Sequence, residues 1–175
     1  MKVILDSKQI EQILCDLTAR IVSDTPHDLD IAVIGIRSRG EVLAQRLSNQ
    51  LAEKIGRDVP CGTLDITLYR DDLNTPNSSS HPHVRTTDIG FDIDDKIIIL
   101  VDDVLYTGRS TRAAMAALID LGRPKAIKLA VLVDRLGREM PITADYAGYK
   151  TDVAPGKLVQ VNLVESDGKD EVIVD

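Results

Sequence analysis

Apolar and polar positions along the chain follow two periods, and together they predict strands separated by helices. Continuous aliphatic runs at 31–36, 96–101 and 126–133 are typical of strands buried on both faces. At 63–69 apolar and polar residues alternate, which predicts a strand with one less buried face. Strands that alternate with helices indicate an α/β fold, with a mostly parallel central sheet and helices on both faces.

The helices are predicted from apolar spacing and from the residues at their ends. Asp6 followed by Gln9 has the form of a capping box, so a first helix should begin there and end near Pro26. A third helix is expected over about 111–121. A second helix follows the 31–36 strand, with Gly56 as its C-cap and with one apolar face formed by Leu43, Leu47, Leu51 and Ile55.

A chain of 175 residues suits one domain, 1–175, with a full hydrophobic core. The polar stretch at about 70–92 is longer than an ordinary connection, and we interpret it as a lid. Beyond Asp134 the sequence predicts only a turn and short strands near 157–164 and 171–174.

Charge and cysteine usage narrow the class of protein. The formal net charge of −7 argues against RNA or DNA as the main ligand, although a local basic face remains compatible with it. Cys15 and Cys61 stand alone, which favours buried free thiols in a reducing compartment. The N-terminal segment has too few consecutive apolar residues for a secretory signal, so we expect a cytoplasmic protein.

The segment 98–110 combines features that point to chemistry. An aliphatic strand ends in Asp102 and Asp103, and a short loop through Thr107 to Ser110 leads into a helix. Ligands of open α/β sheets lie beyond the carboxyl ends of strands, and a glycine-containing helix start can hold an anion with backbone N–H groups. A phosphorylated sugar would satisfy both the carboxylates and the loop. Taken singly, the features fit simpler roles: a metal or solvated loop end, and helix caps.

These residues also resemble a known family. The 98–110 segment resembles the phosphoribosyl pyrophosphate signature of type I phosphoribosyltransferases. Together with 35–40, 64–73 and 121–135, it resembles the bifunctional pyrimidine-operon regulator and uracil phosphoribosyltransferase family over about 3–149. The resemblance implies the type I phosphoribosyltransferase fold.

The family fold implies a small hood formed by about 134–175 and a set of substrate contacts. Asp102 and Asp103 would contact the ribose hydroxyls, and Ser38 to Gly40 would form the pyrophosphate loop, where Arg39 offers a forked donor set. The alternative for this loop is a solvated turn. The implied contacts to phosphoribosyl pyrophosphate are Ser38, Arg39, Gly40, Asp102, Asp103, Val104, Leu105, Tyr106, Thr107, Gly108, Arg109 and Ser110.

The implied reaction displaces pyrophosphate from ribose C1 by uracil N1 and forms UMP. Catalysis would stabilise the leaving pyrophosphate, with Mg²⁺ carried by the substrate and in contact with Asp102 and Asp103 only indirectly. Arg70 or Arg85 would reach the pyrophosphate when the lid closes; for both, an exposed loop charge is the alternative. The implied catalytic residues are Arg39, Arg70, Asp102 and Asp103.

Base recognition is implied at the end of the 126–133 strand, by Val133, Asp134, Arg135 and Arg138. Here the chain departs from the family pattern, because Gly137 stands in place of a His and Tyr149 in place of a Lys. In the family these two belong to the basic surface linked to RNA binding. Their loss and the net charge of −7 put RNA attenuation in doubt more than catalysis.

Three functions therefore remain open. The favoured one is a uracil phosphoribosyltransferase. The second is a weakly catalytic, RNA-binding regulator that senses UMP or phosphoribosyl pyrophosphate, and the third is a phosphoribosyltransferase for another base, such as a purine. In each case the resemblance implies a homo-oligomer, a dimer or larger.

Overall fold

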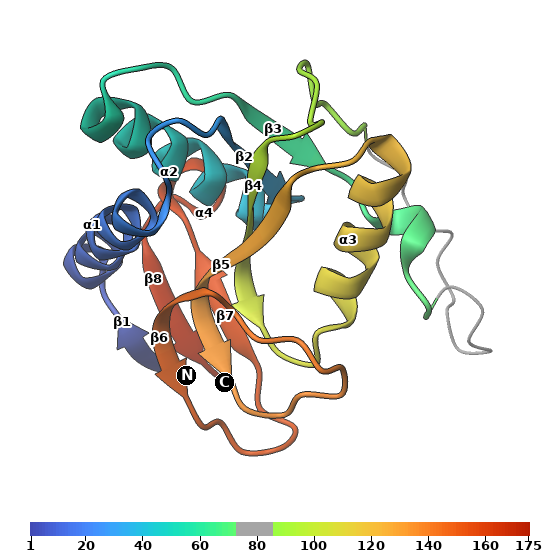
Figure 1. The fold of residues 1–175 in the computed structure, drawn as a ribbon. Coiled ribbons are helices and arrows are strands. Elements are labelled where there is room, and N and C mark those ends of the chain that lie inside the picture. The colour runs from blue at the N-terminus through green and yellow to red at the C-terminus, as the bar shows by residue number, and fades with distance from the viewer. Residues whose placement is uncertain (73–85) are drawn as a thin grey trace.

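In the computed structural model, which describes residues 1–72 and 86–175, two sheets and their helices form one α/β unit (Figure 1). A parallel sheet has the strand order β3-β2-β4-β5-β6, and an antiparallel sheet has the order β1-β8-β7. The strands are β1 (Lys2–Leu5), β2 (Ile31–Ile36), β3 (Cys61–Leu64), β4 (Ile97–Leu105), β5 (Ala126–Arg135), β6 (Tyr146–Thr151), β7 (Val159–Asn162) and β8 (Glu171–Val174). The helices are α1 (Ser7–Asp24), α2 (Arg39–Ile55), α3 (Arg109–Leu121), α4 (Val164–Asp167) and the short 3-10 helix η1 (Thr67–Tyr69).

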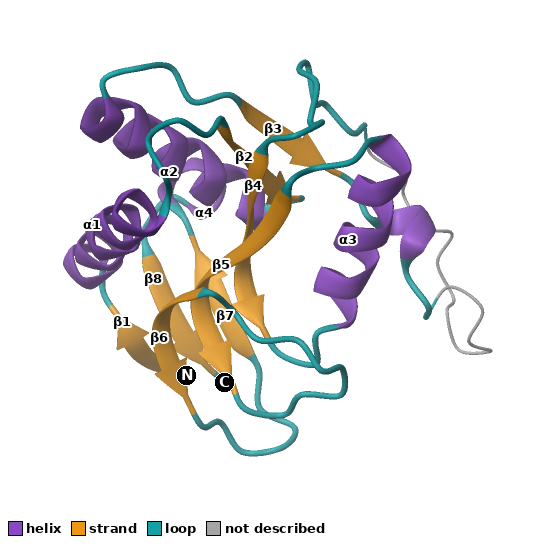
Figure 2. Cartoon of the chain, viewed as in Figure 1, coloured by secondary structure: helices purple, strands orange, loops and turns teal. Residues whose placement is uncertain are grey.

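The parallel sheet is covered on both faces, as the sequence predicts (Figure 2). Alternate residues of one strand enter different cores: Ile99 packs with α1 and α2, whereas Ile98 and Leu100 pack with α3. On the α3 side the helix contributes small residues, Ala113 and Ala114, and these let it lie close to the strands. The aliphatic runs read from the sequence therefore form the middle layer.

The predicted helix ends are confirmed by their caps. The Asp6 carboxylate accepts the Gln9 backbone N–H at 2.9 Å, and the Gln9 side-chain oxygen accepts the Asp6 N–H at 2.9 Å. Gly56 ends α2 with a φ of 76°, in the left-handed region that glycine adopts without strain, and its N–H donates to the Ala52 carbonyl. The start of α1 and the end of α2 are therefore each set by residues within one helical turn.

The strand predicted at 63–69 is shorter in the structure and is followed by η1. The Asp65 carboxylate accepts the Thr67 N–H at 3.1 Å and the Thr67 hydroxyl at 2.6 Å. A side chain that bonds backbone two residues on favours a turn over a strand, so β3 ends at Leu64. Asp65, a polar residue of the alternating pattern, thus forms a turn and does not extend the strand.

Strand β4 is longer than the 96–101 run because its polar end is also paired. In the β4–β5 ladder Asp102 lies opposite Val131, and Leu105 lies opposite Asp134. Strands β1 and β6 have no long apolar run, and β1 is paired with the far end of the chain, Lys2 opposite Val174. The sequence did not predict these two strands.

The antiparallel sheet contains the two short C-terminal strands that were predicted, and it takes its third strand from the N-terminus. The hood limits of about 134–175 and the lid limits of about 70–92 stay predictions; residues 73–85, including Arg85, lie outside the described part of the chain. Cys15 is exposed rather than buried, because it lies on the outer face of α1, and Cys61 is half-buried. In the described ranges no helix is long and apolar enough to cross a membrane, and a cytoplasmic location stays a prediction.

Candidate functional site

A pocket of about 160 Å³ lies where β4 ends and α3 begins. Larger hollows of about 480 and 500 Å³ lie elsewhere on the described surface, but the residues that line them include neither the end of β4 nor the start of α3. The smaller pocket joins a strand-end carboxylate to a helix start, which is the combination that the sequence singled out. It is lined by Asp102, Val104, Leu105, Tyr106, Thr107, Gly108, Ser110 and Thr111.

The two adjacent carboxylates at the end of β4 differ in their surroundings. Asp102 is only 9% exposed, and its Oδ1 accepts the Asp103 N–H at 2.9 Å. Burial, followed by the neighbouring charge of Asp103, raises the pKa of Asp102 well above its usual range. Asp103 is less buried, and its Oδ1 accepts the Val104 N–H at 2.9 Å. Sugar hydroxyls or a cation beside this pair would compensate the buried charge.

The turn before α3 has the geometry of an anion site. Gly108 stands at the N-cap with a φ of 89°, and the hydroxyl of the preceding Thr107 accepts the Arg109 N–H at 3.3 Å. The Thr107 carbonyl accepts the N–H groups of Glu139 and Met140, both at 2.9 Å, so the turn is held from behind. The bond to Arg109 is long, and backbone N–H groups at such a helix start can bind a phosphate.

The loop before α2 lies directly beside these carboxylates. A Cβ added at Gly40 would lie 2.7 Å from the Val101 carbonyl oxygen and 3.3 Å from Asp102 Cα. Gly40 is therefore required by a close approach of α2 to β4, and not by a turn. The peptide bond from Arg37 to Ser38 is cis, and Ser38 is the N-cap residue of α2. The structure thus brings Ser38 to Gly40 next to Asp102.

We expect Gly40→Ala to lower the free energy of unfolding by about 1–3 kcal/mol, because the added methyl group forces α2 away from β4. Denaturant-induced unfolding measures the change. Gly90→Ala is the matched control, since none of the described atoms lies within 4 Å of an added Cβ there. A loss of stability equal to that of the control would show that the Gly40 contact is not tight.

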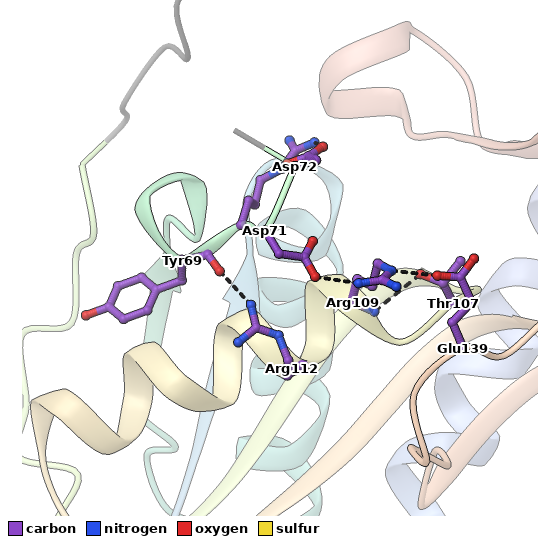
Figure 3. A network of polar contacts seen from close by, with 8 residues as sticks. Tyr69, Asp71, Asp72, Thr107, Arg109, Arg112 and Glu139 are labelled. Carbon is purple, nitrogen blue, oxygen red and sulfur yellow. Dashed lines mark hydrogen bonds and ion pairs between the residues drawn. The ribbon is translucent and has the colours of Figure 1, made fainter. Parts of the chain in front are cut away.

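The side chain of Arg109, which does not line the pocket, joins the start of α3 to two other segments (Figure 3). Its Nε donates to Glu139 at 2.6 Å and its Nη1 to Asp71 at 2.5 Å. These bonds, that to Glu139 first, raise the pKa of Arg109. Arg112 adds a bond to the Tyr69 carbonyl at 2.8 Å. The Arg109 backbone N–H donates to the Thr107 hydroxyl at 3.3 Å, and its role in phosphate binding stays a prediction.

Two arginines predicted to act in catalysis are paired with carboxylates. Arg70 bonds Asp72 at 3.0 and 2.5 Å, and its side chain is 52% exposed. Arg39 donates from Nη2 to Asp167 at 2.9 Å, while its Nε is buried and has no hydrogen-bond partner among the described residues. Their catalytic roles stay predictions.

The residues predicted to bind the base come together at the end of β5, where several are occupied internally. Val133 is fully buried, and the Asp134 carboxylate accepts Arg138 Nη2 at 2.5 Å. Arg138 also donates from Nε to the Ile142 carbonyl at 2.9 Å and from Nη1 to the carbonyls of Leu105, Tyr106 and Arg135. Arg138 therefore holds the turn behind the pocket in place.

Sequence reasoning missed a stacked pair beside the pocket. The Arg135 guanidinium lies 3.9 Å from the centre of the Tyr106 ring, and Arg135 is 3% exposed. A Cβ at Gly137 would lie 2.3 Å from the same ring, so the Gly at the family's His position leaves room for Tyr106. The aromatic residue three positions after Asp103 was the available signal.

The sequence matches the phosphoribosyl transferase domain family over residues 1–175. A bifunctional protein PyrR of Deinococcus radiodurans is 50% identical over 169 residues, which are 97% of this chain and 91% of that protein. The protein of the same name from Ligilactobacillus salivarius is 47% identical over 171 residues, 98% of this chain and 96% of that one.

Solved structures resemble the fold. A hypoxanthine-guanine phosphoribosyltransferase of Bacillus anthracis matches with a TM-score of 0.72 at 20% identity, covering 100% of this chain and 98% of that one. A hypoxanthine phosphoribosyltransferase of Trypanosoma cruzi matches with a TM-score of 0.72 at 18% identity, covering 99% and 95%. At such identities the likeness concerns the fold alone.

Proposed function

The chain belongs to the phosphoribosyltransferase family, and on that premise we propose that it is a uracil phosphoribosyltransferase, which forms UMP and pyrophosphate from uracil and phosphoribosyl pyrophosphate. The observation that carries the proposal is the pocket between Asp102 and the start of α3. It matches a ligand with hydroxyls at one end and a phosphate at the other. The choice of uracil rests on the relatives named PyrR and on the 64–73 resemblance.

Each part of the pocket has a role in this reaction. Asp102 and Asp103 accept hydrogen bonds from the ribose 2′- and 3′-hydroxyls, and the first turn of α3 binds the 5′-phosphate. The C1–O bond breaks with its electron pair on pyrophosphate, uracil N1 bonds to C1, and the N1 proton is released. The loop Ser38 to Gly40 lies on the pyrophosphate side, where N–H groups and Arg39 stabilise the leaving charge.

The residues present fit a magnesium ion that arrives with the substrate. Asp102 and Asp103 place two carboxylates side by side, and because Asp102 is buried, its charged form would gain from a nearby cation. Through the ribose hydroxyls these two side chains would orient the ion's ligands. When bound, Mg²⁺ would neutralise part of the negative charge of pyrophosphate.

The base would lie toward the end of β5. We propose that Val133 and Asp134 form the wall against which the base lies. Arg135 and Arg138 hold this wall in position. Support comes from their placement: Arg138 bonds the Tyr106 carbonyl, and Arg135 stacks on the Tyr106 ring, so both are joined to the pocket lining. Arg70 would bind the pyrophosphate if its guanidinium exchanged the Asp72 carboxylate for pyrophosphate oxygens.

The test is a panel of bases with phosphoribosyl pyrophosphate and Mg²⁺. We expect UMP from uracil, and at least tenfold less nucleotide from hypoxanthine, guanine or orotate, because one lost hydrogen-bonded group costs roughly that ratio or more. Product identity by chromatography is the measurement. A purine nucleotide as main product would assign another base, and absence of product with every base would favour the regulator.

A second candidate function is RNA binding in the attenuation of pyrimidine genes, which the word bifunctional in the names of the relatives supports. Gly137 and Tyr149, which replace basic family residues, weigh against it. Binding of a pyrimidine-operon leader RNA at several salt concentrations tests it, because phosphate contacts give a steep salt dependence. Affinity equal to that for an unrelated RNA of the same length would reject this function.

Self-association is also part of the proposal, as a dimer or a larger homo-oligomer. It rests on the family resemblance. Light scattering coupled to gel filtration measures the mass, and a monomer of 19.2 kDa would contradict it.

A further inference from the structure

The guanidinium of Arg39 has a partner from the opposite end of the chain. Arg39 opens α2, where the pyrophosphate loop is proposed, and its Nη2 lies 2.9 Å from Asp167 Oδ1 in α4. The two side chains are 31% and 22% exposed, so the pair is partly shielded from water. The Arg39 Nε is buried without a hydrogen-bond partner among the described residues, so the guanidinium is only partly satisfied.

Asp167 is held firmly in this position. Its other oxygen accepts the Leu163 N–H at 2.9 Å. That bond and the bond from Arg39 lower the pKa of Asp167, so the carboxylate is charged at neutral pH. The fold therefore presents a fixed negative charge to Arg39.

The segment around Asp167 is anchored to the same helix that carries Arg39. Arg46, seven residues further along α2, bonds Glu165 at 2.9 and 2.5 Å and Asp170 at 2.8 and 2.9 Å. Asp170 in turn accepts the Val164 N–H at 2.7 Å. Four side-chain bonds from Arg46 therefore hold the segment that contains Asp167. The position of Asp167 does not depend on its contact with Arg39 alone.

A carboxylate and a phosphate oxygen compete for the same N–H groups of an arginine. We propose that Asp167 occupies the position at Arg39 that a pyrophosphate oxygen takes, and that it thereby weakens pyrophosphate binding and favours release of this product. The inference rests on the proposed function and deepens it, because it names the residue that sets the affinity for the pyrophosphate group. Pyrophosphate must displace or share this contact.

The test is Asp167→Asn in the full chain, titrated with inorganic pyrophosphate and Mg²⁺ in a calorimeter. Asparagine keeps an oxygen for the Leu163 N–H and removes the charge that competes at Arg39. We expect pyrophosphate to bind about two- to fivefold more tightly, the upper part of the range for loss of one partly exposed ion pair. In steady-state kinetics, the inhibition constant for pyrophosphate should fall by the same factor.

Glu165→Gln is the matched control, because it removes an equal charge two residues away that contacts Arg46 and not Arg39. We expect it to change pyrophosphate affinity less than twofold. Equal gains in both variants would show a general field effect and overturn the inference. Weaker binding by Asp167→Asn would show that the carboxylate positions Arg39 for the ligand, which also overturns it.

A second substitution separates this inference from the proposed function. In an Arg39→Gln background the gain from Asp167→Asn should vanish, because the contested donor is gone; a gain that persists overturns the inference. If the unaltered protein binds neither pyrophosphate nor phosphoribosyl pyrophosphate, the proposed function itself fails. If it binds both and forms UMP, yet Asp167→Asn leaves the affinity unchanged, only the role of Asp167 fails.

Discussion

Replacement of Asp103 by asparagine is expected to weaken the binding of phosphoribosyl pyrophosphate by about 10- to 100-fold, the loss of one or two hydrogen bonds to a charged acceptor. The Asp103 carboxylate is partly exposed beside the pocket and already accepts the Val104 N–H. Asparagine retains that bond through its oxygen but offers the ribose hydroxyls a neutral acceptor. The midpoint of thermal unfolding should therefore stay close to that of the unaltered protein, while the dissociation constant rises.

A matched control is available elsewhere on the surface. Asp92 is an exposed carboxylate whose Oδ1 accepts the Asp94 N–H at 2.9 Å, the same type of local bond that Asp103 makes. Asp92→Asn should leave the affinity unchanged. Calorimetric titration of both variants with phosphoribosyl pyrophosphate and Mg²⁺ gives the comparison. If Asp103→Asn binds as tightly as Asp92→Asn, the carboxylate assignment is wrong.

Replacement of Arg46 by methionine is expected to cost about 2–3 kcal/mol of unfolding free energy, because it leaves two carboxylates without their partner. The Arg46 and Asp170 side chains are 20% and 14% exposed, so this pair is shielded more than an ordinary surface pair. For a domain of this size the midpoint of thermal unfolding should fall by roughly 5–10 °C. Differential scanning calorimetry measures it.

The control for Arg46 is Arg57, whose pair with Asp30 spans 3.8 Å and is largely exposed. Arg57→Met should change the unfolding free energy by no more than about 0.5 kcal/mol. Equal losses in the two variants would show that the contacts of Arg46 contribute nothing beyond surface charge.

The effect of Arg46 should also depend on pH with a defined sign. The hydrogen bonds from Arg46 lower the pKa of both Glu165 and Asp170 in the folded protein. A carboxylate with a lowered folded pKa contributes stability above its unfolded pKa, roughly 4, and loses it as the pH falls through the folded value. The difference between the unaltered protein and Arg46→Met should therefore be full at pH 7 and narrow below about pH 4. A difference that is independent of pH would contradict the ion-pair explanation.

The central layer and the main pocket could be predicted from local patterns. Aliphatic runs are buried wherever they pack, so 31–36 and 126–133 became strands without reference to the rest of the chain. Asp6 and Gly56 act on backbone within one turn of themselves, and both capped their helices. Asp102 lines the pocket, as predicted, because a strand end and a helix start are adjacent in the sequence itself, whereas Asp103 is not among the lining residues.

Other features depend on residues that meet only when the chain is packed. Lys2 pairs with Val174 across nearly the whole chain, and Arg39 pairs with Asp167 across 128 residues. No local pattern announces such pairs, because their energy arises from contacts whose partners are chosen by the fold. Arg138 is an example, since this residue, for which base binding stays a prediction, donates to carbonyls that three separate segments bring around it. Local sequence patterns thus specified the central strands, the helices and the strand end that lines the pocket, because these depend on residues close in the chain. The strands β1 and β6 and the partners of the charged side chains were decided only by long-range packing.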